Sequence, residues 1–400
     1  MTNSVTSTVS STASKSFNRA VKATSAMMLL ALLGGCATIS NLNPFGSAKL
    51  KPAELQSFTP QIKVANSWSV DVGDSEQGNF APVLFESTVY AASEEGQLVA
   101  IDRATGKTKW KVKVGSKLKA GVAATLDTVA VIDVNNNLLA FDSAGKQKWQ
   151  SGVGSDVSSV PVGASGTILV RGIDFSVIAF SASNGAQRWK YTRQLPPLTL
   201  RVNSPVDVNN ARVYAGFPGG RLVALDLNAG TVSWEGSLAT PTGTTEIERI
   251  TDVTGTPIYN FREVCAAAFQ GKLGCLDAVS ARPVWTADFS APSGASVDDR
   301  YMIAPNESGD LFAFSRSGGK QVWRIETFQR RLPTTPTVIG RAVAVGDFEG
   351  YVHFIERDTG KTIARTKVGS TTFTSQPVPV ETDAIIVQSR GGSVALISVQ

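Results

Sequence analysis

The stretch Gly96-Gln97-Leu98-Val99-Ala100-Ile101-Asp102-Arg103-Ala104-Thr105-Gly106-Lys107-Thr108-Lys109-Trp110 decides the fold, because the chain repeats its pattern eight times. The copies begin at residues 96, 136, 175, 220, 271, 309, 350 and 392, so the gaps between them are 40, 39, 45, 51, 38, 41 and 42 residues. Periods of this size in strand-like sequence are typical of β-propeller blades. Because one blade cannot bury both of its faces alone, the blades must close together as a single domain.

Each repeat combines a short apolar strand with a tight turn. Leu98 to Ile101 is apolar at every position, as expected for a strand with neighbouring sheets on both of its faces. The Asp102 carboxylate can then accept backbone N–H groups, and Gly106 can adopt the positive φ that a tight hairpin requires. Calcium binding is the alternative for the aspartates of this column, and we favour turn capping. The other aspartates of the column are Asp142, Asp226 and Asp277.

The tryptophans predict how the ring closes. We expect each indole to pack from the outer strand of its blade against the next blade. Trp68 precedes the first copy of the repeat, whereas the last copy stops at Gln400 before its tryptophan. We therefore predict that a strand near Trp68 completes the last blade, giving an all-β, eight-bladed β-propeller of four-stranded antiparallel blades. The column consists of all seven tryptophans: Trp68, Trp110, Trp149, Trp189, Trp234, Trp285 and Trp323.

The amino terminus has the organisation of a bacterial signal peptide. An acid-free basic region precedes apolar residues 26–33, which are too few to span a bilayer as a helix. The segment ends in Leu33-Gly34-Gly35-Cys36, which resembles the lipobox of bacterial lipoproteins, so Cys36 is predicted to carry a diacylglycerol anchor. An ordinary signal peptide with a chance cysteine is the alternative. Ala37, in place of Asp, resembles the sorting signal for the Gram-negative outer membrane, which predicts the periplasmic face of that membrane.

The residues after the signal lack strand periodicity. They contain Asn, Pro, Gly and Ser, so we interpret them as a flexible tether. The expected organisation is a signal peptide over residues 1–35, a lipidated tether over 36–60 and the propeller over 61–400.

Charge and chemistry-bearing residues exclude several functions. The formal net charge is +5, and three of the excess positive charges lie in the signal, so the remainder is near neutral and gives no case for nucleic-acid binding. The single histidine, His353, has no surrounding set of ligands in the sequence, so we expect neither a metal site nor a catalytic site. Cys265 and Cys275 lie on the two arms of a predicted hairpin and form either a disulfide or two buried thiols.

Two intervals between repeats are longer than the other five. The intervals that end at residues 220 and 271 carry extra residues after Trp189 and Trp234, in connections from an outer strand to the next inner strand. Such connections emerge on one rim of a propeller, and these two belong to adjacent blades. We therefore expect one contiguous surface, on the kind of loop where function tends to reside.

The composition of the two insertions indicates a protein interface. In the first, Leu198 and Leu200 beside Arg201 combine an apolar anchor with a polar group. The alternative is that both leucines begin the next inner strand and point inward. The second, Thr245-Glu246-Ile247-Glu248, is a weak capping-box pattern for one helical turn. The acidic group there, Glu248 with Asp252, could pair with a basic partner surface.

The repeat Ala-x-Asp-x-x-Thr-Gly-x-x-x-Trp resembles that of pyrroloquinoline-quinone (PQQ) dehydrogenases. The whole chain after the signal more specifically resembles the BamB family of outer-membrane assembly lipoproteins, through the lipobox and residues 198–205, 242–253 and 346–351. This resemblance implies a non-enzymatic scaffold that binds the POTRA domains of BamA in the β-barrel assembly (BAM) complex. By position, Leu198, Leu200, Arg201 and Asp252 match the family's BamA-binding surface. We add Glu248 from the acidic group of the second insertion.

The resemblance also defines the competing hypotheses. A quinoprotein dehydrogenase would carry adjacent cysteines, a set of calcium-binding carboxylates and a catalytic Asp. Here Cys265 and Cys275 are ten residues apart and no loop offers such carboxylates, so we expect no cofactor and no enzyme. A propeller that binds another periplasmic ligand, such as a peptide or a glycan, stays open. Further expected partners are the outer membrane, through Cys36, and unfolded outer-membrane proteins.

Overall fold

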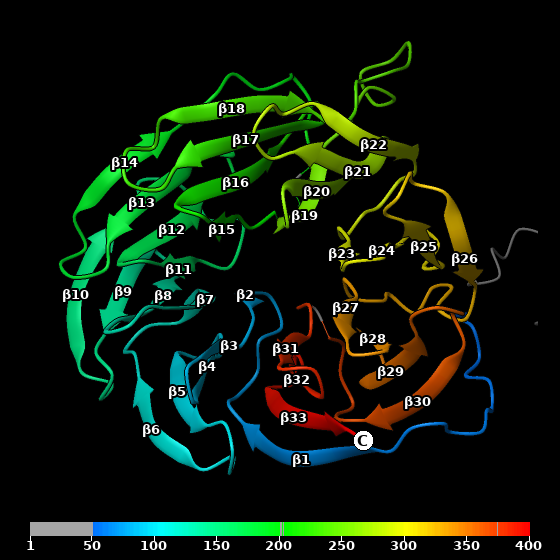
Figure 1. Ribbon diagram of the computed structural model, residues 1–400. Coiled ribbons are helices and arrows are strands. Elements are labelled where there is room, and N and C mark those ends of the chain that lie inside the picture. The colour runs from blue at the N-terminus through cyan, green and yellow to red at the C-terminus, as the bar shows by residue number, and fades with distance from the viewer. Residues whose placement is uncertain (1–50, 201, 203, 374) are drawn as a thin grey trace, which may run out of the picture. The chain divides into compact units, whose positions relative to one another are not determined.

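Eight antiparallel sheets follow one another around a ring (Figure 1). The computed structural model describes residues 51–200, 202, 204–373 and 375–400, and the structural statements below concern these residues. Seven sheets have four strands, and the sheet of blade 2 has a short fifth. In the seven blades whose four strands follow one another along the chain, the first of the four lies toward the centre of the ring and the last lies at the outside. The predicted all-β, eight-bladed β-propeller is confirmed.

The strands are given from the centre outward, blade by blade. Blades 1 to 4 contain β3 (Val83–Phe85), β4 (Thr88–Ala92), β5 (Gln97–Asp102) and β6 (Thr108–Lys113); β7 (Leu118–Ala124), β8 (Val129–Asp133), β9 (Asn137–Phe141) and β10 (Gln147–Gly152); β11 (Val162–Ala164), β12 (Thr167–Arg171), β13 (Val177–Ser181) and β14 (Gln187–Tyr191); and β15 (Asp207–Asn209), β16 (Arg212–Phe217), β17 (Arg221–Asp226) and β18 (Val232–Ser237).

Blades 5 to 8 contain β19 (Val253–Asn260), β20 (Glu263–Ala268), β21 (Lys272–Asp277) and β22 (Pro283–Asp288); β23 (Ser296–Val297), β24 (Tyr301–Pro305), β25 (Leu311–Ser315) and β26 (Gln321–Ile325); β27 (Thr337–Ile339), β28 (Ala342–Gly346), β29 (Tyr351–Glu356) and β30 (Thr362–Lys367); and β31 (Val378–Val380), β32 (Ala384–Gln388), β33 (Ser393–Val399) and β1 (Val64–Asp71). A short fifth strand, β2 (Asn79–Phe80), runs parallel to β7 in blade 2.

The ring closes through its amino-terminal strand, as the tryptophan column predicts. Strand β1 pairs antiparallel with β33, from Val64 opposite Val399 to Asp71 opposite Ser393. It is the outermost strand of blade 8, whose other three strands come from the carboxyl terminus. The last blade is therefore completed without a covalent link between its two parts.

The tryptophans join each blade to the next. Their side chains lie on outer strands, and six of the seven indoles donate the Nε1–H group to a backbone carbonyl of the following blade. Trp68 of blade 8, for example, donates to the carbonyl of Arg103 in blade 1 at 2.8 Å, which makes the closing contact the same as the others. The remaining pairs are Trp110 with Ser143, Trp149 with Ala182, Trp189 with Leu227, Trp234 with Ala278 and Trp323 with Arg357.

The aspartates of the repeat cap turns, as expected. Asp102 Oδ1 accepts the Thr105 backbone N–H at 3.0 Å and the Thr105 hydroxyl at 2.8 Å. Asp277 Oδ1 accepts the backbone N–H groups of Val279 at 3.1 Å and Ser280 at 2.7 Å. These bonds hold the pKa of both carboxyls below the usual range, so the charged form is the one that stabilises the turn.

Cys265 and Cys275 face each other across β20 and β21 and form a disulfide. Both residues are buried in the core between blades 5 and 6. Glu263 lies within reach of the two sulfurs, but the bond between the sulfurs removes the thiolates that a metal would need. The hairpin prediction is confirmed, and the disulfide alternative holds.

The amino-terminal boundary differs from the expectation. Residues 52–400 form one compact unit, so residues 52–60 belong to the ordered body rather than to a free tether. The Ala53 N–H donates to the Gln329 carbonyl at 3.0 Å, a contact that sequence periodicity could not reveal. The signal peptide, Cys36 and Arg201 lie outside the described residues. In the part of the chain that is described, no helix has the length and apolar character needed to cross a bilayer.

Candidate functional site at the insertion rim

Two long connections share one rim of the propeller. Residues 192–206 join β14 to β15, and residues 238–252 join β18 to β19. Both run from an outer strand to the next inner strand, as predicted, and we name this side of the ring the insertion rim. Because β15 begins only at residue 207, Leu198 and Leu200 lie in the loop, and the alternative that they open the inner strand is wrong.

One buried carboxylate ties the two insertions together. Asp252, at the end of the second insertion, accepts the backbone N–H of Leu200 at Oδ2 with a distance of 2.6 Å. Its Oδ1 accepts the N–H of Gly219, in the turn between β16 and β17, at 3.4 Å. The Ser204 hydroxyl ties the end of the first insertion to β19, which follows the second insertion, by donating to the Gly255 carbonyl at 3.1 Å. The expected contiguity of the two insertions is present in the structure.

The position of Asp252 corrects its expected role. The residue is only 1% exposed, so its carboxylate faces the inside of the loops and not a partner surface. Burial raises its pKa, and the bonds from Leu200 and Gly219 only partly oppose that effect. Asp252 therefore positions the first insertion from beneath.

The middle of the first insertion exposes apolar side chains. Leu198 is 42% exposed, and Leu200 is half-buried above the Asp252 carboxylate. The Leu200 backbone is fixed, so its side chain has a defined place on the rim. An apolar side chain held in a defined place on a rigid loop can fill a pocket on a partner protein.

The second insertion forms the predicted capping box. The Thr245 hydroxyl accepts the Glu248 N–H at 3.2 Å, and the Glu248 carboxylate accepts the N–H groups of Thr244 at 2.8 Å and Thr245 at 3.1 Å. These bonds lower the pKa of Glu248. The turn presents Ile247, which is 66% exposed and which sequence reasoning did not select. The sequence feature that could have identified Ile247 is a single apolar residue within the polar segment of the capping box.

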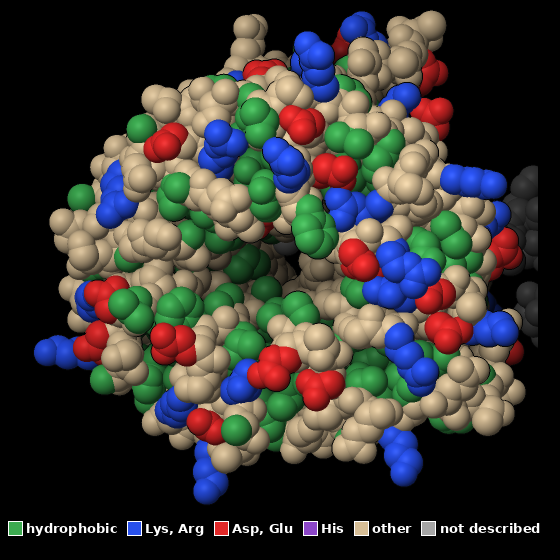
Figure 2. Space-filling model, in the orientation of Figure 1, with side chains coloured by type: hydrophobic (Ala, Val, Ile, Leu, Met, Phe, Trp, Pro, Cys, Tyr) green, Lys and Arg blue, Asp and Glu red, His purple; other side chains and the backbone are tan. Residues whose placement is uncertain are grey.

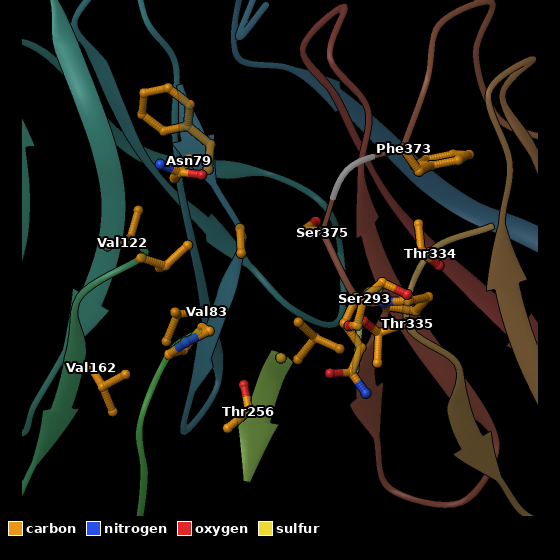
Figure 3. Close-up of a pocket in the computed structure, with 18 of the residues that line it drawn as sticks. Asn79, Val83, Val122, Val162, Thr256, Ser293, Thr334, Thr335, Phe373 and Ser375 are labelled. Carbon is orange, nitrogen blue, oxygen red and sulfur yellow. The ribbon is translucent and has the colours of Figure 1, made fainter. Parts of the chain in front are cut away.

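A central cavity of about 880 Å³ lies among the inner strands and connecting loops (Figure 3). Its lining is apolar, with hydroxyl and amide groups from residues such as Asn79, Thr256, Ser293 and Thr334. The hollow is visible at the centre of the face in Figure 2, where hydrophobic side chains surround it. Among the described lining residues Arg390 is the one charged side chain, and there is no carboxylate. A quinone cofactor held through calcium needs carboxylate ligands, so this lining does not fit it.

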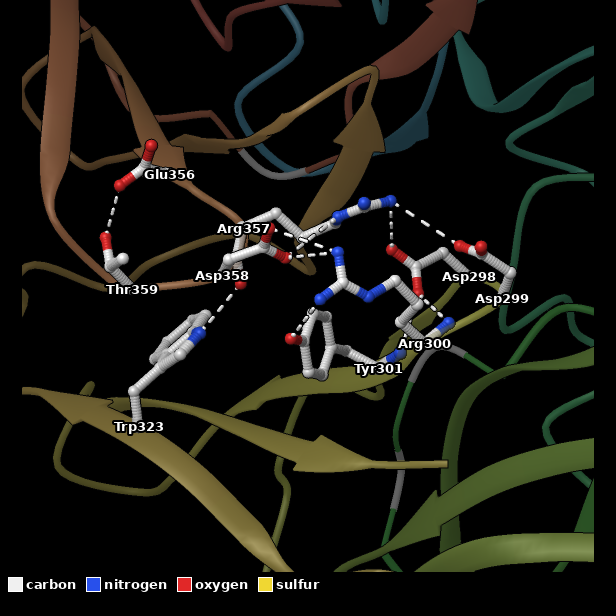
Figure 4. Close-up of polar contacts among 9 residues, drawn as sticks. All are labelled: Asp298, Asp299, Arg300, Tyr301, Trp323, Glu356, Arg357, Asp358 and Thr359. Carbon is white, nitrogen blue, oxygen red and sulfur yellow. Dashed lines mark hydrogen bonds and ion pairs between the residues drawn. The ribbon is translucent and has the colours of Figure 1, made fainter. Parts of the chain in front are cut away.

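A polar cluster on the opposite rim has a structural role (Figure 4). Arg300 pairs with Asp358 at 3.0 Å, and Arg357 pairs with Asp298 at 3.1 Å. These pairs join the turn between β23 and β24 in blade 6 to the turn between β29 and β30 in blade 7. Both arginines form ion pairs with carboxylates of the cluster, so we interpret the cluster as a stabilising contact between the two blades.

The repeat, the tryptophan ties and the two rim insertions define a closed propeller scaffold of the PQQ-like repeat class. A family model described as outer membrane protein assembly factor BamB matches residues 65–120, 110–325 and 307–400. The chain is 37% identical to outer membrane protein assembly factor BamB of Bordetella pertussis over 369 residues, which cover 92% of this chain and 94% of that protein. It is 38% identical to the BamB of Burkholderia pseudomallei over 346 residues, covering 86% and 91%. The chain therefore belongs to the BamB family of outer membrane protein assembly factors.

Solved structures agree on the fold. The crystal structure of BamB from Moraxella catarrhalis matches with a TM-score of 0.75 at 22% identity, covering 84% of this chain and 100% of that one. Quinohemoprotein alcohol dehydrogenase from Comamonas testosteroni matches with a TM-score of 0.63 at 14% identity, covering 84% and 76%. At these identities the similarity concerns the propeller architecture.

Proposed function

We propose that this chain is a non-enzymatic scaffold of outer membrane protein assembly that binds the POTRA domains of BamA through its insertion rim. Lipid attached at Cys36 anchors it to the periplasmic face of the outer membrane. Membership of the BamB family supports the assignment to the BAM complex. The single observation that carries the binding surface is the bond from the Leu200 N–H to Asp252, which holds an exposed apolar loop against the second insertion.

The chemistry of the rim fits a protein partner. Leu198 and Ile247 supply exposed apolar area, and Glu248 supplies a negative charge close to it. A few such anchors on a rigid support carry most of the binding energy in typical interfaces. Asp252 contributes indirectly, by keeping Leu200 in place.

The cavity lining supports a function without catalysis. The dehydrogenases that share the fold use a bound cofactor, whereas the described lining here offers no carboxylate set to hold one. The cysteines are joined in a disulfide between β20 and β21, and neither of them lines the cavity. The chain therefore assists outer-membrane assembly by binding other proteins, including unfolded outer-membrane proteins.

The experiment is co-purification of BamA with a variant that carries Leu200→Ala and Arg201→Glu. Loss of an apolar anchor and a charge reversal should weaken binding by about 30-fold or more, because hot-spot residues contribute about 2 kcal/mol or more each. The matched control carries Val279→Ala and Arg282→Glu on the opposite rim, where both side chains are exposed. Both variants should keep the circular dichroism spectrum of the parent. Retention of BamA at the parental level by the first variant would reject this surface.

A further inference from the structure

Residues 52–63, which we name the strap, lie along the outside of blade 7 before β1 begins (Figure 1, blue). At one end, the Ala53 N–H donates to the Gln329 carbonyl at 3.0 Å. At the other end, the Gln61 N–H donates to the Ile363 carbonyl at 2.8 Å, and the Ile62 side chain is buried in the core of blades 7 and 8. The strap is therefore docked at both ends.

The middle of the strap rests on one side chain of β30. The Arg365 guanidinium lies 5.2 Å from the centre of the Phe58 ring. Its Nη2 donates to the Gln56 carbonyl at 3.4 Å. Because Arg365 and Phe58 are only partly buried and Gln56 is exposed, this contact stabilises the strap weakly.

A buried arginine holds the start of the strap. Arg331 donates from Nη1 to the Ala53 carbonyl at 2.9 Å, and from Nε and Nη2 to the Asp347 carboxylate at 3.0 and 2.7 Å. Its Nη2 also contacts Glu349. Asp347 is fully buried and accepts a further bond from His353 at 2.9 Å. A guanidinium fixed in this way has one defined orientation toward the strap.

Turn geometry alone does not require this arginine. Asp347 caps the turn between β28 and β29 by accepting two backbone N–H groups. In blade 2, Asp133 caps the corresponding turn without an arginine partner among the described residues, and in blade 6 the uncharged Asn306 does so. What Arg331 adds in blade 7 is the bond to Ala53.

The clamped end of the strap lies on the insertion rim. Gln329 and Arg331 belong to residues 326–336, which connect outer strand β26 to inner strand β27, the same type of connection as the two insertions. The strap then crosses the outside of β30 to the opposite rim, where Lys63 pairs with Gln400. Whatever path the preceding residues take, they join the propeller at the insertion rim.

We propose that Arg331 is a positioning residue that fixes the exit of the membrane tether on the insertion rim, so that the lipid anchor and the partner-binding loops act on the same side of the propeller. This inference rests on the proposed lipidation of Cys36. Residues 37–51 span at most about 50 Å when fully extended, which sets the upper limit on the distance between this rim and the lipid anchor. Loss of the clamp would add residues 52–60 to the tether and shift its attachment toward the opposite rim.

Glutamyl endopeptidase tests the clamp in the full protein purified in detergent. Glu54 is the one acidic residue of the strap, and a docked backbone cannot enter a protease active site. Cleavage after Glu54 should be slow in the parent and about tenfold faster in Arg331→Lys, because a lysine cannot reach Asp347 and Ala53 with the same fork of donors. Arg324→Lys is the matched control, since Arg324 pairs with the buried Asp310 in blade 6 and does not contact the strap. Cleavage after the exposed Glu246 serves as the internal standard.

A second variant separates the clamp from the stability of the blade. Arg331→Met with Asp347→Asn removes both buried charges, and Asn can cap the turn as Asn306 does. This variant should also be cut rapidly after Glu54, with unchanged cleavage after Glu356 in β29. Equal cleavage after Glu54 in the parent and in both clamp variants would overturn the proposal. The assay contains neither BamA nor a membrane, so its result is independent of the co-purification experiment.

Discussion

At the residue scale, Asp252 shows how a buried charge organises an exposed surface. Its two oxygens accept N–H groups from different segments of the chain. These hydrogen bonds replace those to water that the carboxylate loses on burial, and they offset only part of the free energy of desolvation. The sequence correctly places Asp252 in the second insertion, but the expectation that its carboxylate faces a partner is wrong, because the residue is buried. The reason is that its burial depends on Leu200 and Gly219, which are distant in the sequence.

The raised pKa of Asp252 predicts a pH dependence. Burial moves this pKa above its ordinary value of 3.8, so the native state binds the proton more readily than the unfolded state. The parent should therefore lose stability relative to Asp252→Asn as the pH rises from about 3.8 through the raised pKa. Denaturant unfolding of both proteins between about pH 4 and pH 7 measures this difference. A difference that does not change with pH, or that changes in the other direction, would show that the carboxylate is not desolvated.

Gly230 carries a second residue-scale prediction. It has a φ of +69°, and a Cβ there would lie 2.5 Å from Trp189 Cδ2, in the contact that joins blades 3 and 4. Gly230→Ala should therefore destabilise the protein by more than about 1 kcal/mol. The matched change is Ala281→Gly, because Ala281 has a φ of 58° in the corresponding turn of blade 5. Thermal unfolding should show a lower Tm for Gly230→Ala and no loss for Ala281→Gly; the reverse order would contradict the packing account.

At the element scale, the β20–β21 hairpin carries the disulfide. Closing a loop of this size stabilises a protein by about 3 kcal/mol in the chain-entropy model. Cys265→Ser with Cys275→Ser should lower the free energy of unfolding by roughly that amount. Alkylation of the unfolded parent without reductant should label neither cysteine, and labelling of both would show that the thiols are free.

The elements also show what the sequence could predict. The apolar strands, the capped turns and the hairpin that carries Cys265 and Cys275 depend on local periodicity and spacing, and each is present; the sequence left open whether the two cysteines are joined. The strap does not follow a period, because backbone groups and the distant side chains Arg331 and Arg365 hold it. The exposure of Ile247 was missed for a similar reason, since the capping box fixed the turn but not its direction.

At the scale of the whole molecule, non-covalent closure predicts that the chain tolerates circular permutation. Lys63 and Gln400 exchange two backbone hydrogen bonds, a geometry that a two-residue Asn-Gly turn can connect. A chain of residues 72–400 followed by Asn-Gly and residues 63–71 should fold with a Tm within a few degrees of unpermuted 63–400. Residues 72–400 alone should be strongly destabilised, because blade 8 loses its outer strand and Trp68. Equal stability of that truncated chain would show that β1 does not close the ring.

The closed ring is the physical reason for proposing a binding surface on the rim. Neighbouring blades cover both faces of each blade. Residues can therefore change without loss of the core mainly in the connections between strands. The two insertions are connections from an outer strand to the next inner strand, and the strap is held by Arg331 in a third connection of this type on the same side of the ring. The sequence showed which residues make up the two insertions. Only the fold showed that Asp252 holds the first insertion and that Arg331 holds the strap.

Site-specific photocrosslinking in living cells tests the central claim most directly. A photoreactive amino acid is placed at Leu198 or Ile247 on the insertion rim, and at Phe261 or Val279, which are exposed at turns of the opposite rim. We predict that adducts with BamA form from the first two positions and not from the other two. Adducts from Phe261 and Val279, with none from Leu198 and Ile247, would contradict the account.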